Sequence, residues 1–185
     1  LEAGEAAMTE CERNRPANIG MTLTDTLTID LGGRSVQIEY QGRANTAGDL
    51  VGWLPESRTL LTGDLVVSPF PFATMPYVSE WAQVLRQLDA RNATLILPGH
   101  GPVMRDAAYL RDVAAVLESI STQARAAWQP GMTLDSLRKR IDVSSHAERF
   151  SRGDPFLRVN FNVQMSSAIA RMWQELAREW KPEGN

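Results

Sequence analysis

The chain has 185 residues, of which 43% are hydrophobic and 22% charged, and its formal net charge is −3 at pH 7. This length predicts one domain with a real apolar core. The negative charge and the lack of a basic block argue against nucleic acid as a partner. No apolar run reaches the roughly 18 residues that a membrane span needs, so we expect no membrane insertion. A lone cysteine, Cys11, excludes an internal disulfide and leaves the redox compartment and the localisation open.

The first twenty residues are small and charged, which is typical of a mobile lead-in, with room for a short helix within 2–12. Because the chain begins at Leu1 and not at Met, we expect a processed protein or a fragment. We predict a single domain over 1–185, with the lead-in at 1–20, a sheet-rich part at 21–105 and a helical part at 106–185.

Strict alternation of apolar and polar residues predicts an antiparallel hairpin over 22–40, turned at Gly32-Gly33, where both glycines accept positive φ. Short strands at 50–54 and 59–62, separated by the turn 55–58, would complete a four-stranded meander. The apolar run at 94–97 predicts a fifth strand. One face of the hairpin would carry these side chains: Leu23, Leu27, Ile29, Val36, Ile38 and Tyr40.

Helical periodicity predicts helices over 77–90, 106–128 and 159–180, with a short helix after the N-cap residue Thr133. Three prolines keep 67–75 irregular, and the aromatic residues there would either line a substrate pocket or pack beneath the next helix. His146 falls in a polar connector and is expected to be a surface histidine. Together the elements predict an α/β fold, a mixed sheet packed with helices.

Two strand-like runs end in motifs with metal-ligand chemistry. One is Thr62-Gly63-Asp64, and the other is Pro98-Gly99-His100-Gly101. Carboxylates and imidazoles are the ligands that zinc and similar divalent ions take in proteins. Each motif alone has a simpler explanation, because a Gly-Asp turn can cap backbone amides and a glycine-flanked histidine can bond a carbonyl. Their order favours a shared site, and the turn 42–49, which contains Asn45, would lie at the same edge.

The order of these motifs resembles the second half of a metallo-β-lactamase-fold protein, from about residue 22 to the helix after Val103. The resemblance implies one half of an αββα sandwich, with Asp64 bridging two zinc ions and His100 binding one of them. It also implies that Asn45 stands where the family has a histidine ligand, and an amide is a poor zinc ligand. The His-x-His-x-Asp-His motif of the family's first half is absent, since the chain has only two histidines.

The resemblance implies two functions. The first is a zinc hydrolase fragment or shortened form, in which metal-bound hydroxide attacks an ester, thioester, lactone or amide carbonyl of a small molecule. The second is a non-catalytic scaffold or assembly module that has lost its metal centre. Because Asp64 and His100 are two ligands and a catalytic zinc takes about three, we expect weak or absent zinc binding by this chain.

The resemblance also bears on assembly, because the family packs two sheets face to face. This chain has the strands of one sheet, so the apolar hairpin face needs another cover. We expect a second copy, giving a homo-oligomer, or a docked N-terminal half. A stripe on the last helix would contribute: Met172, Trp173, Leu176 and Trp180.

Overall fold

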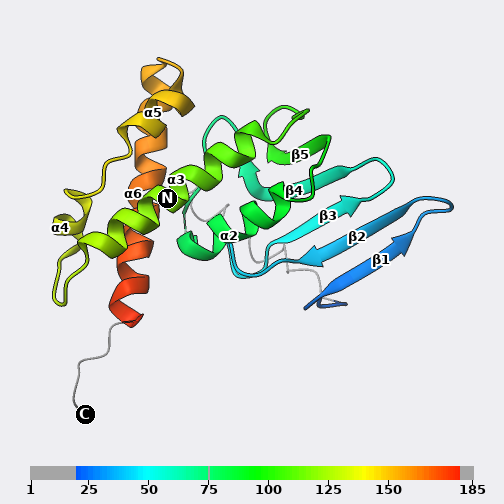
Figure 1. Cartoon of the computed structure of the whole chain (residues 1–185), viewed down its shortest axis with the longest axis horizontal. Coiled ribbons are helices and arrows are strands. Elements are labelled where there is room, and N and C mark those ends of the chain that lie inside the picture. The colour runs from blue at the N-terminus through cyan, green and yellow to red at the C-terminus, as the bar shows by residue number, and fades with distance from the viewer. Residues whose placement is uncertain (1–19, 75, 180–185) are drawn as a thin grey trace, which may run out of the picture.

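The computed structural model describes residues 20–74 and 76–179. Its centre is a five-stranded sheet in which the strands follow chain order (Figure 1). Neighbours pair antiparallel through β4, and β5 runs parallel to β4. The predicted meander, its added fifth strand and the α/β class are therefore confirmed. The strands are β1 (Thr26–Asp30), β2 (Ser35–Tyr40), β3 (Leu50–Leu54), β4 (Thr59–Val67) and β5 (Leu95–His100).

The hairpin turn has the predicted chemistry. Gly32 and Gly33 have φ values of 80° and 91°, a region closed to most side chains. Leu31 N donates to Arg34 O at 2.8 Å and closes the turn. This turn fixes the register, which places Leu27 opposite Ile38 on one face of the sheet.

Two strands are longer than the sequence predicts, and both extensions carry site residues. The prediction ended β4 at Thr62, but the strand runs through Asp64 to Val67. Its pairing with β5 shifts register on both sides of Gly63, which has a φ of 50°. This irregularity lets the strand bend without stopping. β5 likewise continues to His100, so His100 ends a strand and does not stand at the tip of a turn.

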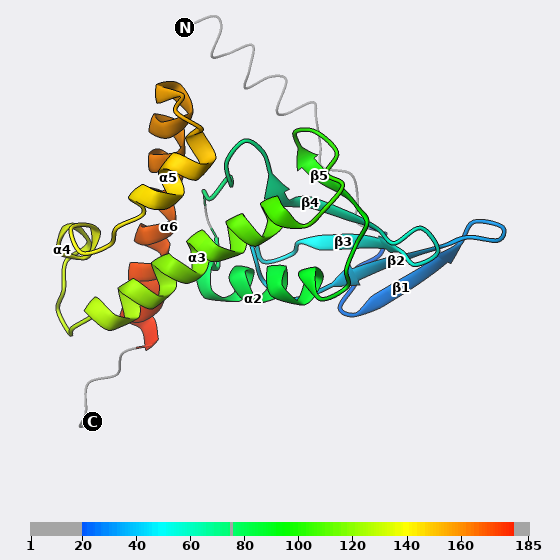
Figure 2. The ribbon, with the colours of Figure 1, turned by 45° about the horizontal axis from the view of Figure 1, so that its top comes forward.

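Five helices accompany the sheet in the described part of the chain, and the three long ones were predicted. α2 and α3 cross one face of the sheet, and α5 and α6 stand side by side beyond α3 (Figures 1 and 2). The helices are α2 (Val78–Asp89), α3 (Ala108–Ala127), α4 (Leu134–Arg138), α5 (Ser144–Ser151) and α6 (Pro155–Glu179). Within the described residues, none of them has the length and apolarity that crossing a bilayer requires.

Two helix predictions need correction, and one is confirmed. Thr133 does cap α4, because its Oγ1 accepts from Ser136 N at 3.3 Å. The predicted polar connector around His146 is helix α5, and His146 is half-buried there. α6 starts at Pro155, four residues before the predicted start, because Asp154 Oδ1 accepts from Phe156 N at 2.8 Å. Proline suits this first position, since its missing N–H has no helical partner.

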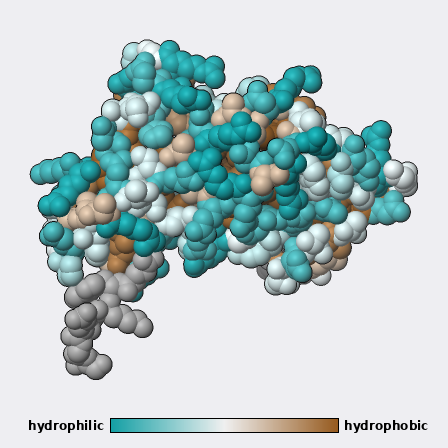
Figure 3. Space-filling model, viewed as in Figure 1, coloured by the Kyte–Doolittle hydropathy of each residue, from teal (hydrophilic) through white to brown (hydrophobic). Residues whose placement is uncertain are grey.

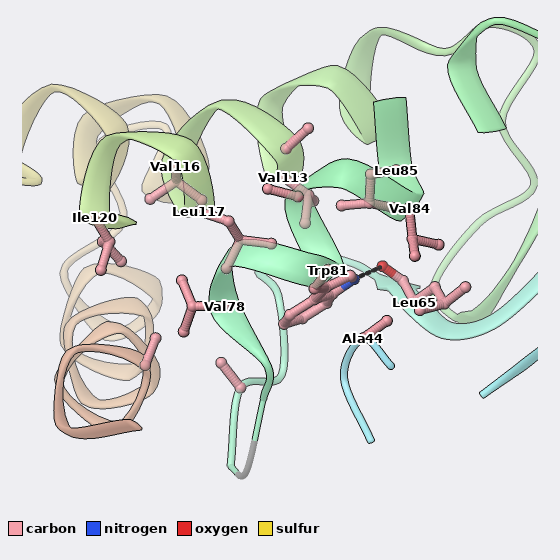
Figure 4. Close-up of a cluster of buried hydrophobic side chains, with 14 of the residues drawn as sticks. Ala44, Leu65, Val78, Trp81, Val84, Leu85, Val113, Val116, Leu117 and Ile120 are labelled. Atoms are coloured by element: carbon pink, nitrogen blue, oxygen red, sulfur yellow. Dashed lines mark hydrogen bonds between the residues drawn. The ribbon is translucent and has the colours of Figure 1, made fainter. Parts of the chain in front are cut away.

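The core begins between the sheet and the two helices that cross it (Figure 4), and it continues into the packing of α3 against α5 and α6. Trp81 on α2 is completely buried, and its Nε1 donates to Leu65 O of β4 at 3.2 Å. This bond satisfies the indole N–H inside an apolar cluster and ties the helix to the strand that carries Asp64. The other residues labelled in Figure 4 belong to the same buried cluster: Ala44, Val78, Val84, Leu85, Val113, Val116, Leu117 and Ile120.

The other face of the sheet is apolar and has no cover among the described residues. Register aligns one apolar row across the strands, with Leu27 opposite Ile38, Gly52 opposite Leu61, and Leu61 opposite Leu97. Ile29 and Leu61 on this face are 42% and 37% exposed. The helix-covered side is mainly hydrophilic on its outer surface (Figure 3). We call the row and its flanking residues the open sheet face: Leu27, Ile29, Val36, Ile38, Leu61 and Leu97.

The segment after β4 is irregular, as predicted, and α6 holds it in place. Ala73 N in this segment donates to Gln164 Oε1 at 2.8 Å, and Val78 N at the start of the following helix α2 donates to Glu175 Oε1 at 3.1 Å. Of its aromatic residues, Phe70 packs on the core and Phe72 is exposed.

Some sequence predictions fall outside the described residues. These are residues 1–19 of the lead-in with its short helix and Cys11, and the Trp180 end of the last stripe. The division of the chain into one domain with three parts stays a prediction.

Candidate metal centre

Asp64 and His100 lie together at one edge of the sheet. His100 Nε2 is 3.6 Å from Asp64 Oδ1, and the two side chains are 70% and 49% exposed. Two ligands on bonds of about 2 Å at a tetrahedral metal stand about 3.3 Å apart. The observed separation is therefore close to that of two ligands of one ion.

Gly99 makes this approach sterically feasible. A Cβ at this position would lie 2.1 Å from Asp64 Oδ1 and 2.7 Å from the Gly63 carbonyl carbon. Every residue other than glycine would therefore push β4 and β5 apart at this point. Together with the bulge at Gly63, the two glycines set the position of the carboxylate.

Asn45 lies beside Asp64, as its order in the sequence suggested, but its side chain bonds the backbone there. Its side chain is buried, and Nδ2 donates to Asp64 O at 3.3 Å. The loop around it is held by Thr46 N, which donates to Asp49 Oδ2 at 2.6 Å. Asn45 therefore fixes the main chain at Asp64.

The described residues fit part of a metal site. No group of three or more histidine, cysteine, aspartate or glutamate side chains gathers anywhere in 20–74 and 76–179. The other histidine, His146, belongs to α5 and not to this edge. Two ligands leave a catalytic zinc short of the roughly three protein ligands that it takes.

Sequence reasoning missed the residues behind the site. Ser68 N donates to His100 O at 3.1 Å, which holds the end of β5 against the strand that carries Asp64. Tyr109 Oη donates to Val67 O at 2.7 Å, and burial raises the pKa of this phenol well above its ordinary value. Tyr109 therefore keeps its proton and this bond at neutral pH. The sequence signal for Tyr109 was its position in the first turn of the helix that follows the Pro-Gly-His-Gly motif.

Comparison with known proteins shows which fold the chain resembles. No model of a protein family matches the chain. Two curated relatives, the type 2 metallo-beta-lactamases of Bacillus sp. (strain 170) and Bacillus cereus, are each 31% identical over 87 residues. The match covers 44% of this chain and 34% of each relative. The chain is related to the metallo-β-lactamase-fold superfamily over about half its length.

Solved structures extend the fold likeness. A metallo-beta-lactamase from Pontibacter korlensis matches with a TM-score of 0.51 and 23% identity, over 60% of this chain and 54% of that one. A metallo-beta-lactamase family protein from Thermus thermophilus matches with a TM-score of 0.58 and 16% identity. This match covers 91% of our chain and 54% of the Thermus thermophilus chain. The likeness in fold therefore includes most of the helical part. The chain thus spans about a third of the length of the curated relatives and about half of the length of these two structures.

Proposed function

We propose that this chain supplies one side of the metal centre of a metallo-β-lactamase-type hydrolase, with Asp64 and His100 as two of its ligands. The observation that carries the proposal is the 3.6 Å approach of His100 Nε2 to Asp64 Oδ1 at an exposed sheet edge. The proposed reaction is hydrolysis of an ester, thioester, lactone or amide bond in a small molecule. Zinc, when bound, would lower the pKa of a coordinated water to about 7 and polarise the carbonyl group.

The chain's own residues hold and orient the two ligands. Asp64 contributes negative charge, and His100 contributes a neutral imidazole nitrogen. Asn45 restrains the backbone at Asp64 through its 3.3 Å bond, and Gly99 keeps space for the carboxylate. Restraint of this kind reduces the conformational entropy that the two ligands lose when a metal binds.

A complete centre needs ligands from beyond the described residues. We propose that a second sheet covers the open sheet face and brings those ligands, from a docked N-terminal half or from a second copy of the chain. The support is the exposure of Ile29 and Leu61, together with the match to only 34% of the curated relatives' length. Apolar area gains about 25 cal/mol per Å² when it leaves water, so this face favours a cover.

The second candidate function is a non-catalytic scaffold. It is favoured by Asn45 at the position where the resemblance places a histidine, and by the missing third ligand in the described part of the chain. In this case the fold would persist as a binding or assembly module.

Zinc titration by calorimetry, with elemental analysis of the purified chain, tests the proposal. We expect weak zinc binding by the unmodified chain and tighter binding by Asn45→His, which offers a third ligand beside Asp64. In that background, Asp64→Asn or His100→Ala should lower the affinity, by about 10- to 100-fold or more. His146→Gln is the matched control, because it removes the other histidine and leaves the edge intact.

The outcomes separate the candidates. Tight stoichiometric zinc in the unmodified chain would contradict the expectation of an incomplete centre. Equal zinc binding by Asn45→His and by its Asp64→Asn and His100→Ala derivatives would contradict the assigned ligands and favour the scaffold.

A further inference from the structure

A cavity of about 180 Å³ lies between the end of β4, the start of α3 and the end of α5. Its walls combine apolar residues, among them Phe150 and Leu157, with Arg149 and Arg152. Phe150 is 4% exposed and stacks on Phe161 with ring centroids 5.1 Å apart, so the aromatic wall is well fixed. A wider cavity of about 460 Å³ shares both arginines and adds Arg105.

The charges around these cavities leave an excess of guanidinium groups. Arg149 Nε pairs with Asp112 Oδ2 at 2.6 Å. Asp106 Oδ1 accepts from Ala108 N at 2.8 Å at the start of α3. Across the described part of the chain, the structure gives the side chains of Arg105 and Arg152 no acidic partner. Arg152 thus lines both cavities, and Arg105 lines the wider one, with no carboxylate paired to either side chain.

The backbone at Arg152 is unusual as well. Its φ is 51°, in the left-handed region, at the C-cap of α5. This position favours glycine, and Gly153 follows directly. A large side chain in such a conformation that also lines a cavity is a reason to look for a ligand.

We propose that this cavity binds an organic oxyanion, a carboxylate or a phosphate monoester with a small apolar body. The anionic head would pair with Arg152, whose planar group suits two oxygens at once. The apolar body would pack against Phe150 and Leu157. The proposal is independent of the metal centre, although Ser68 in the cavity wall bonds His100 O through its backbone.

Calorimetric titration of the metal-free chain with three small probes tests this. Benzoate and phenyl phosphate carry the anion, and benzamide has the same ring without charge. We expect at least one anion to bind with about tenfold or greater preference over benzamide, and added salt to weaken it. The anion that binds better identifies the head group.

Two matched variants test whether the anion binds in this cavity. Arg152→Gly removes the guanidinium and suits the left-handed backbone, so it should fold normally and lose about tenfold or more of the anion affinity. Arg58→Gly is the control, because Arg58 also has a positive φ of 49° and lies in the turn between β3 and β4, away from the cavity. Equal binding of benzamide and the anions, or unchanged binding by Arg152→Gly, would overturn the proposal. Failure of zinc binding would leave this result unaffected.

Discussion

At the scale of single residues, Gly99 decides whether the two candidate ligands can meet. Gly99→Ala would bring a methyl group to 2.1 Å from Asp64 Oδ1. We expect a loss of about 2 kcal/mol in the free energy of unfolding, since the neighbouring atoms are mostly backbone and cannot move cheaply. Urea denaturation measures this loss, and zinc binding by the Asn45→His background should fall with it. Gly48→Ala, where nothing lies within 4 Å, is the control and should leave both unchanged.

His146 gives a prediction about pH. Burial lowers its pKa from 6.5, partly opposed by the nearby carboxylate of Asp112. The folded state therefore binds the proton less readily than the unfolded state. Its contribution to stability is full above about pH 6.5 and is lost as the pH falls through the lowered value. We expect His146→Gln to flatten the fall in unfolding free energy below pH 6.5, and an unchanged pH profile would contradict this.

How far the site could be predicted also depends on single residues. The order of the Gly-Asp and Gly-His motifs was enough to place Asp64 beside His100. The bond from Asn45 to the Asp64 carbonyl could not be foreseen, because it depends on the bulge at Gly63 and hence on pairing with β5. The cavity of about 180 Å³ that Arg149 and Arg152 line was not predicted, because Ser68 and Arg152 come together only through the packing of α3 and α5.

At the scale of elements, one ion pair joins β2 to the segment after α2. Arg91 Nη1 donates to Glu39 Oε1 at 2.9 Å, and the Glu39 side chain is 7% exposed. Arg91→Ala would leave this buried carboxylate without its cation, at a cost of about 3 kcal/mol in unfolding free energy. Chemical denaturation would show this as a lower midpoint with an unchanged slope.

The control for that prediction is Arg111→Ala. Arg111 pairs with Asp89 at 3.0 Å, but its side chain is 54% exposed, and such a pair contributes little. Similar losses of unfolding free energy in the two variants would contradict the prediction that the burial of Glu39 makes its ion pair more important than the exposed one.

The elements themselves were predictable where periodicity was strong. Alternation over the hairpin and the apolar stripes of α2 and α3 determined their type and most of their length. The predicted β4 was too short because Gly-Asp is typical of a strand end. In the structure, pairing with β5 extends the strand to Val67. α5 was missed because it is short and polar, and its stability comes from packing on α6 rather than from its own pattern.

At the scale of the whole molecule, the open sheet face gives the prediction about assembly. Without a partner present, we expect the chain to self-associate through this face at micromolar concentration. Ile29→Thr with Leu61→Thr should weaken the association measured by analytical ultracentrifugation. Val159→Thr with Val163→Thr is the control, because these residues are also exposed, at 62% and 58%, but lie on α6. A stable monomer of the unmodified chain, or equal effects of the two pairs, would contradict the prediction.

The bonds from α6 to the segment after β4 and to the start of α2 have a consequence for folding during synthesis. Gln164 and Glu175 bind backbone groups that lie 91 and 97 residues earlier in the chain. During synthesis, the sheet and α2 emerge long before these partners exist, so the segment after β4 and the start of α2 acquire these bonds only when the last helix is present. The sheet can form early, but the connection between β4 and α2 is completed only when α6 has docked.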